Sequence, residues 1–301
     1  MTVPTSEPPT GACVYDIGYR HYDGARLGRG YVRRSLYTQS LRGAYGLGRS
    51  AKSKILPVIL FAVMCLPAGI MVAVTVYAHL TKLPVEYTRY AIFLQAVIGL
   101  FTAAQAPQAV SRDLRFKTVP LYFSRPMERI DYVIAKYGAM ASALFILTGV
   151  PLVILYMGAL LAKLDFATQS TGFGKGLLAA ALLSLLFGGI GLVIAALTPR
   201  RGFGVAAVIA VLTISYAAVS SVQAVAYRQG HTGAIGWLGL FSPITLIDGV
   251  QSWWLGATSS FVRGYGPPDA AAGFVYLLVV LGLIAGCFAL LMRRYRKVGL
   301  G

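Results

Sequence analysis

Charged side chains in one short segment, residues 111–136, are the groups in this sequence best placed to do chemistry. The segment holds six basic and three acidic residues: Arg112, Arg115, Lys117, Arg125, Arg129 and Lys136, with Asp113, Glu128 and Asp131. Such groups can form ion pairs with a partner protein. The stretches on either side, 90–110 and 137–162, carry no formal charge. Because charge is costly in hydrocarbon, the segment must lie in water between two membrane helices.

Patterns for catalysis or metal binding are missing from the sequence. It has no H-E-x-x-H, G-x-S-x-G or paired carboxylates, and its three cysteines form no C-x-x-C pair. The phosphate-binding pattern G-x-x-x-x-G-K-[ST] is absent, because Lys175 in GFGKG is followed by glycine. The sequence therefore predicts no enzyme, no metal site and no cofactor in this chain, and ATP, if the protein uses it, would be bound by another polypeptide.

The elements that must carry the charged segment are apolar. The chain is 57% hydrophobic and 12% charged, with a mean hydropathy of +0.68, and a bilayer needs about 20 apolar residues per helix. Six stretches qualify: 55–80, 90–110, 137–162, 177–197, 203–226 and 270–292. The sequence predicts an all-α, polytopic membrane protein with six transmembrane helices. Apart from Tyr and Cys, the only titratable residue in these stretches is His79, at one end, which does not indicate coupling to an ion gradient.

The positive charges set the expected orientation. With a cytoplasmic N-terminus, 21 of the 27 Lys and Arg residues lie on the inner side and 6 on the outer side. This asymmetry predicts both termini in the cytoplasm. The net charge of +17 is then explained by the orientation of the chain in the membrane and by contacts with anionic lipid headgroups. No nucleic-acid partner is expected. Nineteen Arg against eight Lys and the absence of Asn are typical of a GC-rich bacterial genome, so we expect a bacterial plasma membrane.

The chain divides into a cytoplasmic leader, 1–54, and a six-span transmembrane domain, 55–301. In the leader, residues 31–49 place Val32, Leu36 and Tyr45 on one side with Arg residues between them, which predicts a basic amphipathic helix in the headgroup plane. The Tyr- and Arg-rich stretch before it is either a mobile leader or, as we favour, a strap against the inner helix ends or a partner.

The outer connections differ in length. Residues 166–176 read as a simple outer connection. Residues 227–269 hold all three tryptophans, and Ser242–Pro243 there predicts a helix start, with Ser242 as N-cap. The apolar run that follows is too short to span, so we expect an outer interfacial or re-entrant helix pair.

Two residues are expected to shape the inner ends of the spans. Pro107 is expected to kink the inner end of the second span, and Asp131 is expected to cap the third.

Polar residues form stripes on two of the expected spans: Gln95, Thr102 and Gln105 on the second, and Thr213, Tyr216, Ser220 and Gln223 on the fifth. Small and polar residues often hold membrane helices together, so packing explains these stripes as well as a functional role does. The other interpretation is that they line a translocation path, where uncharged polar groups suit a large, partly apolar cargo.

The chain has a basic amphipathic helix before the first span, a charged segment after the second and a Trp-containing outer segment before the sixth. This arrangement resembles the permease subunit of ATP-binding-cassette exporters of the drug and polysaccharide export type, and so does the segment SRDLRFKTVPLYFSRPMERIDYVIAKY. The resemblance implies two permease copies, identical or paralogous, and two cytoplasmic ATP-binding subunits. It also implies a coupling helix within residues 113–129 that docks on the ATP-binding subunit, and a path between the second and fifth spans. On this chain the implied contacts are Arg112, Asp113, Arg115, Phe116, Tyr122, Arg125 and Glu128.

The expected function is therefore ATP-driven export of an amphipathic drug, antibiotic or lipid-like cargo. Two alternatives stay open. One is a membrane scaffold or channel without an ATPase, and the other is a resistance or sensing complex that does not export. Cargo identity is not readable from the sequence.

Overall fold

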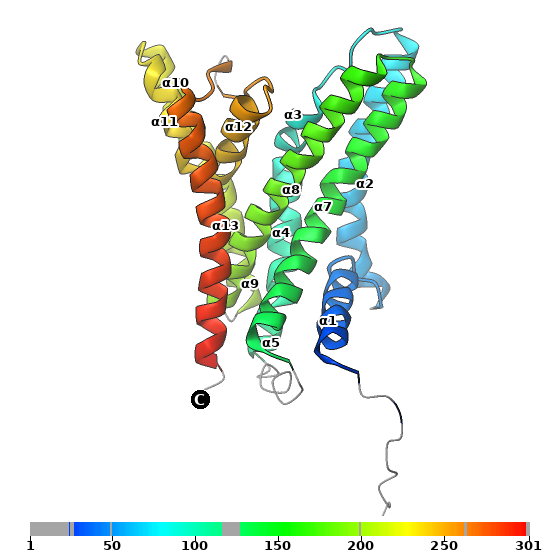
Figure 1. The fold of residues 1–301 in the computed structure, drawn as a ribbon, viewed down its shortest axis with the longest axis vertical. Helices are drawn as coiled ribbons and strands as arrows, with labels where there is room; N and C mark the ends of the chain where they lie inside the picture. Colours follow the sequence, from blue (N-terminus) through cyan, green and yellow to red (C-terminus); the bar gives the residue numbers. More distant parts are fainter. Residues whose placement is uncertain are drawn as a thin grey trace, which may run out of the picture.

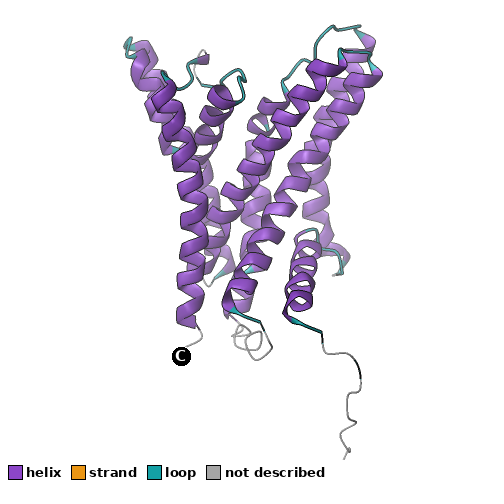
Figure 2. Cartoon of the chain, in the orientation of Figure 1, coloured by secondary structure: helices purple, strands orange, loops and turns teal. Residues whose placement is uncertain are grey.

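The computed structural model describes residues 24, 27–48, 50–115, 127–198, 200–261 and 264–298, and within these ranges it contains helices and no strands. Figures 1 and 2 show them side by side in one bundle. In chain order they are α1 (Arg29–Ala44), α2 (Ala51–Tyr77), α3 (Tyr87–Phe93), α4 (Gln95–Ala109), α5 (Ser111–Arg115), α7 (Arg129–Leu161), α8 (Phe166–Leu197), α9 (Arg201–Ile209), the π-helix η1 (Ala210–Ile214), α10 (Ser215–Arg228), α11 (Thr232–Leu238), the 3₁₀-helix η2 (Gly239–Phe241), α12 (Pro243–Trp254) and α13 (Ala270–Val298).

Five helices of the described chain are long and apolar enough to cross a membrane: α2, α7, α8, the continuous helix Gly202–Arg228, and α13. A sixth crossing is available if α3 and α4, bent by 61°, form one span. This confirms the all-helical, multi-pass class. Figure 1 places α1, α5 and the end of α13 at one end of the bundle, here called the α5 end, and α11 and α12 at the other, the α12 end.

The second predicted span is not one straight helix, which corrects the expectation for residues 90–110. The chain breaks at Leu94, and α4 then continues through Pro107 to Ala109, so the bend is not at the proline. No Gly or Pro occurs at residues 93–95 to signal a break locally. The bend lets α3 lie against α8, where Tyr87 is buried, while the buried Tyr90 donates its hydroxyl to the Met64 carbonyl of α2.

Residues 166–176 are helical, which corrects their prediction as an outer connection. Asp165 caps the new helix start, accepting a hydrogen bond from the Thr168 amide at 2.8 Å. The glycines here make room for α3: a Cβ added at Gly176 would lie 2.8 Å from the Tyr87 Cβ. Propensity alone disfavours glycine in a helix, and close packing overrides it.

Helix α8 also approaches α4 and α7 closely through glycines. A Cβ at Gly191 would lie 2.6 Å from Thr102 Cγ2, and one at Gly189 would lie 2.5 Å from the Tyr137 hydroxyl oxygen. In lipid there is little hydrophobic drive between helices, so association depends on such close contact. The Gly188–Gly189–x–Gly191 run is therefore a packing feature.

The ends of the chain's short helices follow local signals. Helix α1 ends at Ala44, and Gly46 follows it with φ +69°. Helix α12 begins as expected, with Ser242 at the N-cap position and Pro243 directly after it. For the third span the cap differs from the expectation, because Glu128 is the N-cap residue and Asp131 is the third helical residue of α7.

Helix α1 packs along α7 instead of standing apart from the bundle (Figure 1). The Tyr37 hydroxyl donates to Ser142 Oγ at 2.8 Å, and the Tyr45 hydroxyl donates to the Ala143 carbonyl at 2.7 Å. Leu36 is buried, with Val32 beside it against the core. The predicted apolar side of this helix thus contacts protein. Its place in the headgroup plane stays a prediction.

We expect Gly191→Ala to lower the free energy of unfolding by about 1–3 kcal/mol, because the added methyl group overpacks the contact with Thr102. Denaturation in detergent micelles, followed by circular dichroism, measures this. Gly174→Ala is the matched control on the same helix: nothing lies within 4 Å of the position that its added Cβ would take, so it should be neutral or stabilising by up to about 1 kcal/mol. Equal stability of the two variants would contradict the packing role of Gly191.

Candidate functional site

The charged segment begins in α5, which is tied to the end of α8. Ser111 is buried, and its Oγ lies 2.8 Å from the Ala195 carbonyl oxygen and 3.2 Å from that of Thr198. Ala195 lies in the last turn of α8 and Thr198 is its C-cap residue, and such terminal carbonyls have no partner within the helix. A side chain from α5 therefore fixes the start of the charged segment to α8.

An ion pair joins α5 to α7. Lys136 Nζ lies 3.0 Å from Asp113 Oδ2 and also donates to the Ala109 carbonyl at 2.9 Å. The Tyr132 hydroxyl donates to the same Asp113 oxygen at 2.7 Å. The Lys136 and Asp113 side chains are only 11% and 17% exposed. A pair this buried needs such additional hydrogen bonds to offset the loss of hydration.

The same cluster reaches α13. The Tyr132 ring packs edge-on against the Tyr295 ring, with centroids 4.9 Å apart, and both residues are buried. We call Asp113, Tyr132, Lys136 and Tyr295 the inner cluster. It links the first turn of the charged segment to two long helices.

A second set of ion pairs joins α1 to the start of α7. Arg29 pairs with both Glu128 and Asp131, and Arg33 Nη1 lies 3.6 Å from Asp131 Oδ1. The hydrogen bond to Asp131 raises the pKa of Arg29. Asp131 is 1% exposed and also accepts from the Glu128 amide at 3.2 Å. This group, Arg29, Arg33, Glu128 and Asp131, is here called the α1 clasp. Only the i, i+4 spacing of the two arginines hinted at it in the sequence.

The predicted contacts of the charged segment fall into three groups. Asp113 and Glu128 are engaged in the ion pairs above. Arg112 and Arg115 belong to α5, and their side chains lie outside the described residues. Phe116, Tyr122 and Arg125 also lie outside the described residues. Contact of these seven with an ATP-binding subunit stays a prediction.

The second-span stripe lies within the bundle. Thr102 is fully buried against Gly191, and its hydroxyl donates to the Ile98 carbonyl at 2.8 Å. Gln105 is buried, and Gln95 is half-buried at the start of α4. In the single chain, Thr102 therefore takes part in packing between α4 and α8. A role in a path stays a prediction for all three.

The fifth-span stripe divides at the π-helix. Thr213, in η1, is exposed. Tyr216, Ser220 and Gln223 of α10 instead share the wall of a pocket of about 180 Å³, here called the α10–α12 pocket. The rest of its wall comes from α3, α12 and the segment after α12: Ile92, Ile244, Thr245, Asp248, Ser260 and Phe261.

Asp248 is the residue of this pocket that the sequence reasoning missed. It is 2% exposed, and its Oδ2 accepts from Ser259 Oγ at 3.0 Å and from the Ser260 amide at 2.8 Å. Burial raises the pKa of Asp248, against the opposing effects of these hydrogen bonds and the positive charge of Arg89. Asp248 lies in a short helix before the sixth span, so a search limited to the spanning stretches did not reach it.

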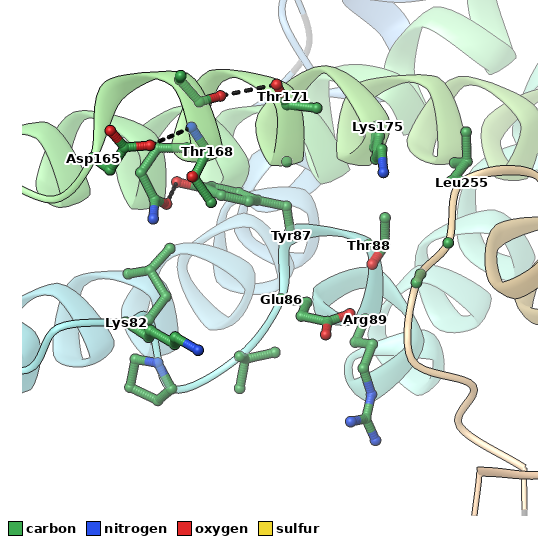
Figure 3. A pocket seen from close by; sticks show the side chains of 18 of the residues that line it. Lys82, Glu86, Tyr87, Thr88, Arg89, Asp165, Thr168, Thr171, Lys175 and Leu255 are labelled. Atoms are coloured by element: carbon green, nitrogen blue, oxygen red, sulfur yellow. Dashed lines mark hydrogen bonds between the residues drawn. The ribbon is translucent and has the colours of Figure 1, made fainter.

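A larger cavity, of about 1020 Å³, lies at the α12 end between residues 81–89, the start of α8 and residues 255–257 (Figure 3). Lys82 and Lys175 line it. Its two carboxylates are already engaged: Glu86 accepts from the amide and hydroxyl of Thr258, and hydrogen bonds from Thr168 lower the pKa of Asp165. The described lining thus combines apolar surface with side chains of both charges.

The family model described as ABC-2 family transporter protein matches residues 34–300, so the chain belongs to that family. No individual curated protein matches it. The match covers the helical bundle from within α1 to the end of α13. The chain is a multi-pass membrane protein of this transporter family, consistent with an ABC-2 type permease subunit, and the family in general pairs with an ATP-binding subunit.

We expect Lys136→Met to lower the free energy of unfolding by about 3 kcal/mol, because it leaves Asp113 partly buried without its cation. The double variant Asp113→Asn/Lys136→Met should recover more than half of this loss, since it removes both charges together. Chemical denaturation of the single and double variants in micelles gives the coupling between the two sites. Losses that simply add would show that the two side chains act independently.

Proposed function

We propose that this chain is the transmembrane permease subunit of an ATP-driven exporter. It would act with a second permease copy, identical or paralogous, and with two cytoplasmic ATP-binding subunits that hold ATP and Mg²⁺. The observation that carries the proposal is the way the charged segment is joined to the helices. Its first turn contacts α7 through Lys136 and α8 through Ser111, and Glu128, the residue before α7, contacts α1.

Force applied to this segment has a direct route into the membrane. A push on α5 acts on the Asp113–Lys136 ion pair and then on α7, while Tyr132 carries it to Tyr295 of α13. Partly buried ion pairs hold their geometry better than exposed ones, which water and salt weaken. Closure of an ATP-binding dimer against the segment would thus tilt long helices as rigid bodies.

The cytoplasmic side would be the α5 end, where α1, α5 and the end of α13 gather (Figure 1). The positive-inside asymmetry supports this orientation. The polar groups of the fifth-span stripe that meet in the α10–α12 pocket support a cargo that is part polar and part apolar. We propose amphipathic drugs, antibiotics or lipid-like molecules, taken from the cytoplasm or the inner leaflet.

The coupling role predicts the outcome of a double substitution in the segment. In vesicles containing the permease and its ATP-binding subunit, Arg125→Ala/Glu128→Ala should reduce export by at least about tenfold, because the docking contacts are lost. The variant should still insert. The measurements are cargo efflux and cargo-stimulated ATP hydrolysis.

Arg34→Ala is the matched control, since it removes an exposed positive charge of α1 that takes part in none of the ion pairs found among the described residues. It should keep most of the activity. Retained transport in the double variant, or an equal loss in the control, would rule out the segment as the coupling element. Binding of no ATP-binding subunit at all would favour a scaffold or channel.

A further inference from the structure

We infer that the α10–α12 pocket binds the ammonium group of a small organic cation, with the Asp248 carboxylate as its counter-ion. Assigning this ligand to the transported cargo rests on the proposed function, whereas the binding itself does not. The pocket combines a buried carboxylate, several uncharged acceptors and an apolar wall. Neither the family match nor the polar stripes of the sequence specify a charge for the ligand.

The carboxylate of Asp248 has unused capacity. Both hydrogen bonds it receives, from Ser259 Oγ and from the Ser260 amide, go to Oδ2. Its Oδ1 accepts none from any residue that the structure describes, although the side chain lines the pocket and is 98% removed from solvent. Oδ1 therefore has acceptor capacity left, and a charged N–H donor would use it.

Other polar side chains of the pocket wall also offer oxygen atoms that can accept a hydrogen bond from a ligand. The Ser260 hydroxyl is buried beside Asp248, where it acts to lower the pKa of that carboxylate, and it makes no hydrogen bond to any other described residue. The side-chain amide N–H of Gln223 donates to the Ile235 carbonyl at 2.9 Å, which leaves the side-chain carbonyl oxygen of Gln223 as an acceptor for a ligand. The Tyr216 and Ser220 hydroxyls complete the set. An ammonium group has three donors and no acceptor, which matches this wall.

Arg89 limits which cation fits. Its positive charge acts on Asp248, but no ion pair of the described chain joins the two, and the guanidinium lies 5.2 Å from the centroid of the Phe93 ring. The carboxylate is therefore only partly compensated. No group of three His, Cys, Asp or Glu side chains that could hold a metal occurs in the described ranges. These features favour a singly charged ligand that donates hydrogen bonds, such as an ammonium group, over a bare metal ion.

The size and apolar part of the wall indicate what carries the ammonium group. A cavity of about 150 Å³ accommodates benzene, so about 180 Å³ accommodates a small ring with one short substituent. Ile92, Ile244 and Phe261 supply apolar surface beside the acceptors. Benzylammonium is a fitting probe, and benzyl alcohol is its uncharged counterpart.

The test is calorimetric titration of the intact chain in detergent micelles with benzylammonium. The unmodified protein should bind it saturably, and benzyl alcohol at least about tenfold more weakly, the difference that one charge-assisted hydrogen bond makes. Asp248→Asn should also weaken benzylammonium at least tenfold. Asn keeps an oxygen that can accept from Ser259 and Ser260, so the pocket should persist.

Asp165→Asn is the matched control, because it removes a carboxylate at the same end of the bundle that lies outside this pocket. Binding should be unchanged in it. A second variant, Ser220→Leu, fills the pocket and keeps Asp248, and it should weaken both probes. If Asp248→Asn does not fold, Ser220→Leu tests whether benzylammonium binds in this pocket.

Three results would overturn the inference: no saturable binding of benzylammonium to the unmodified chain, equal affinity for the alcohol, or full affinity in Asp248→Asn and Ser220→Leu. The assay contains no ATP-binding subunit. Failure of the Arg125→Ala/Glu128→Ala export test would therefore leave this binding intact, and the two proposals fail separately.

Discussion

The structure depends on one electrostatic constraint: a charge taken out of water must find a partner. The long helices obey it by being almost free of charge along their apolar length, and the two buried charges near the start of α7, Asp131 and Lys136, are paired. Lys136 meets Asp113, and Asp131 meets Arg29 and Arg33. Such pairs are weak sources of net stability but are costly to break singly. They therefore determine which helices stay in contact at the α5 end when a force acts on the charged segment.

Close helix contact supplies the rigidity between the two ends. Helix α8 uses glycines to accept Tyr87, Thr102 and Tyr137 from three different helices. Because lipid competes well for apolar side chains, this contact replaces the hydrophobic effect as the force between helices. The inner cluster lies on α5, α7 and α13, whereas the α10–α12 pocket is lined by α3, α10, α12 and the segment after α12.

Polar groups in the two regions have different roles. At the α5 end the carboxylates Asp113, Glu128 and Asp131 are paired with protein cations, so they position helices. In the α10–α12 pocket, Asp248 is fixed through Oδ2 while Oδ1 accepts nothing from the described chain. A fixed carboxylate with spare acceptor capacity is suited to recognition. This contrast supports assigning coupling to the first region and ligand binding to the second.

The sequence alone determined the membrane class, the approximate positions of the apolar helices, the helix start at Ser242–Pro243 and the charged segment, because composition, hydropathy and capping act locally along the chain. Only the tertiary structure decided the rest. The bend after Phe93 and the helix at residues 166–176 arise from contact between α3 and α8. The α1 clasp pairs residues about a hundred positions apart. Asp248 gains its character from burial among α3, α10 and α12, which no local pattern encodes.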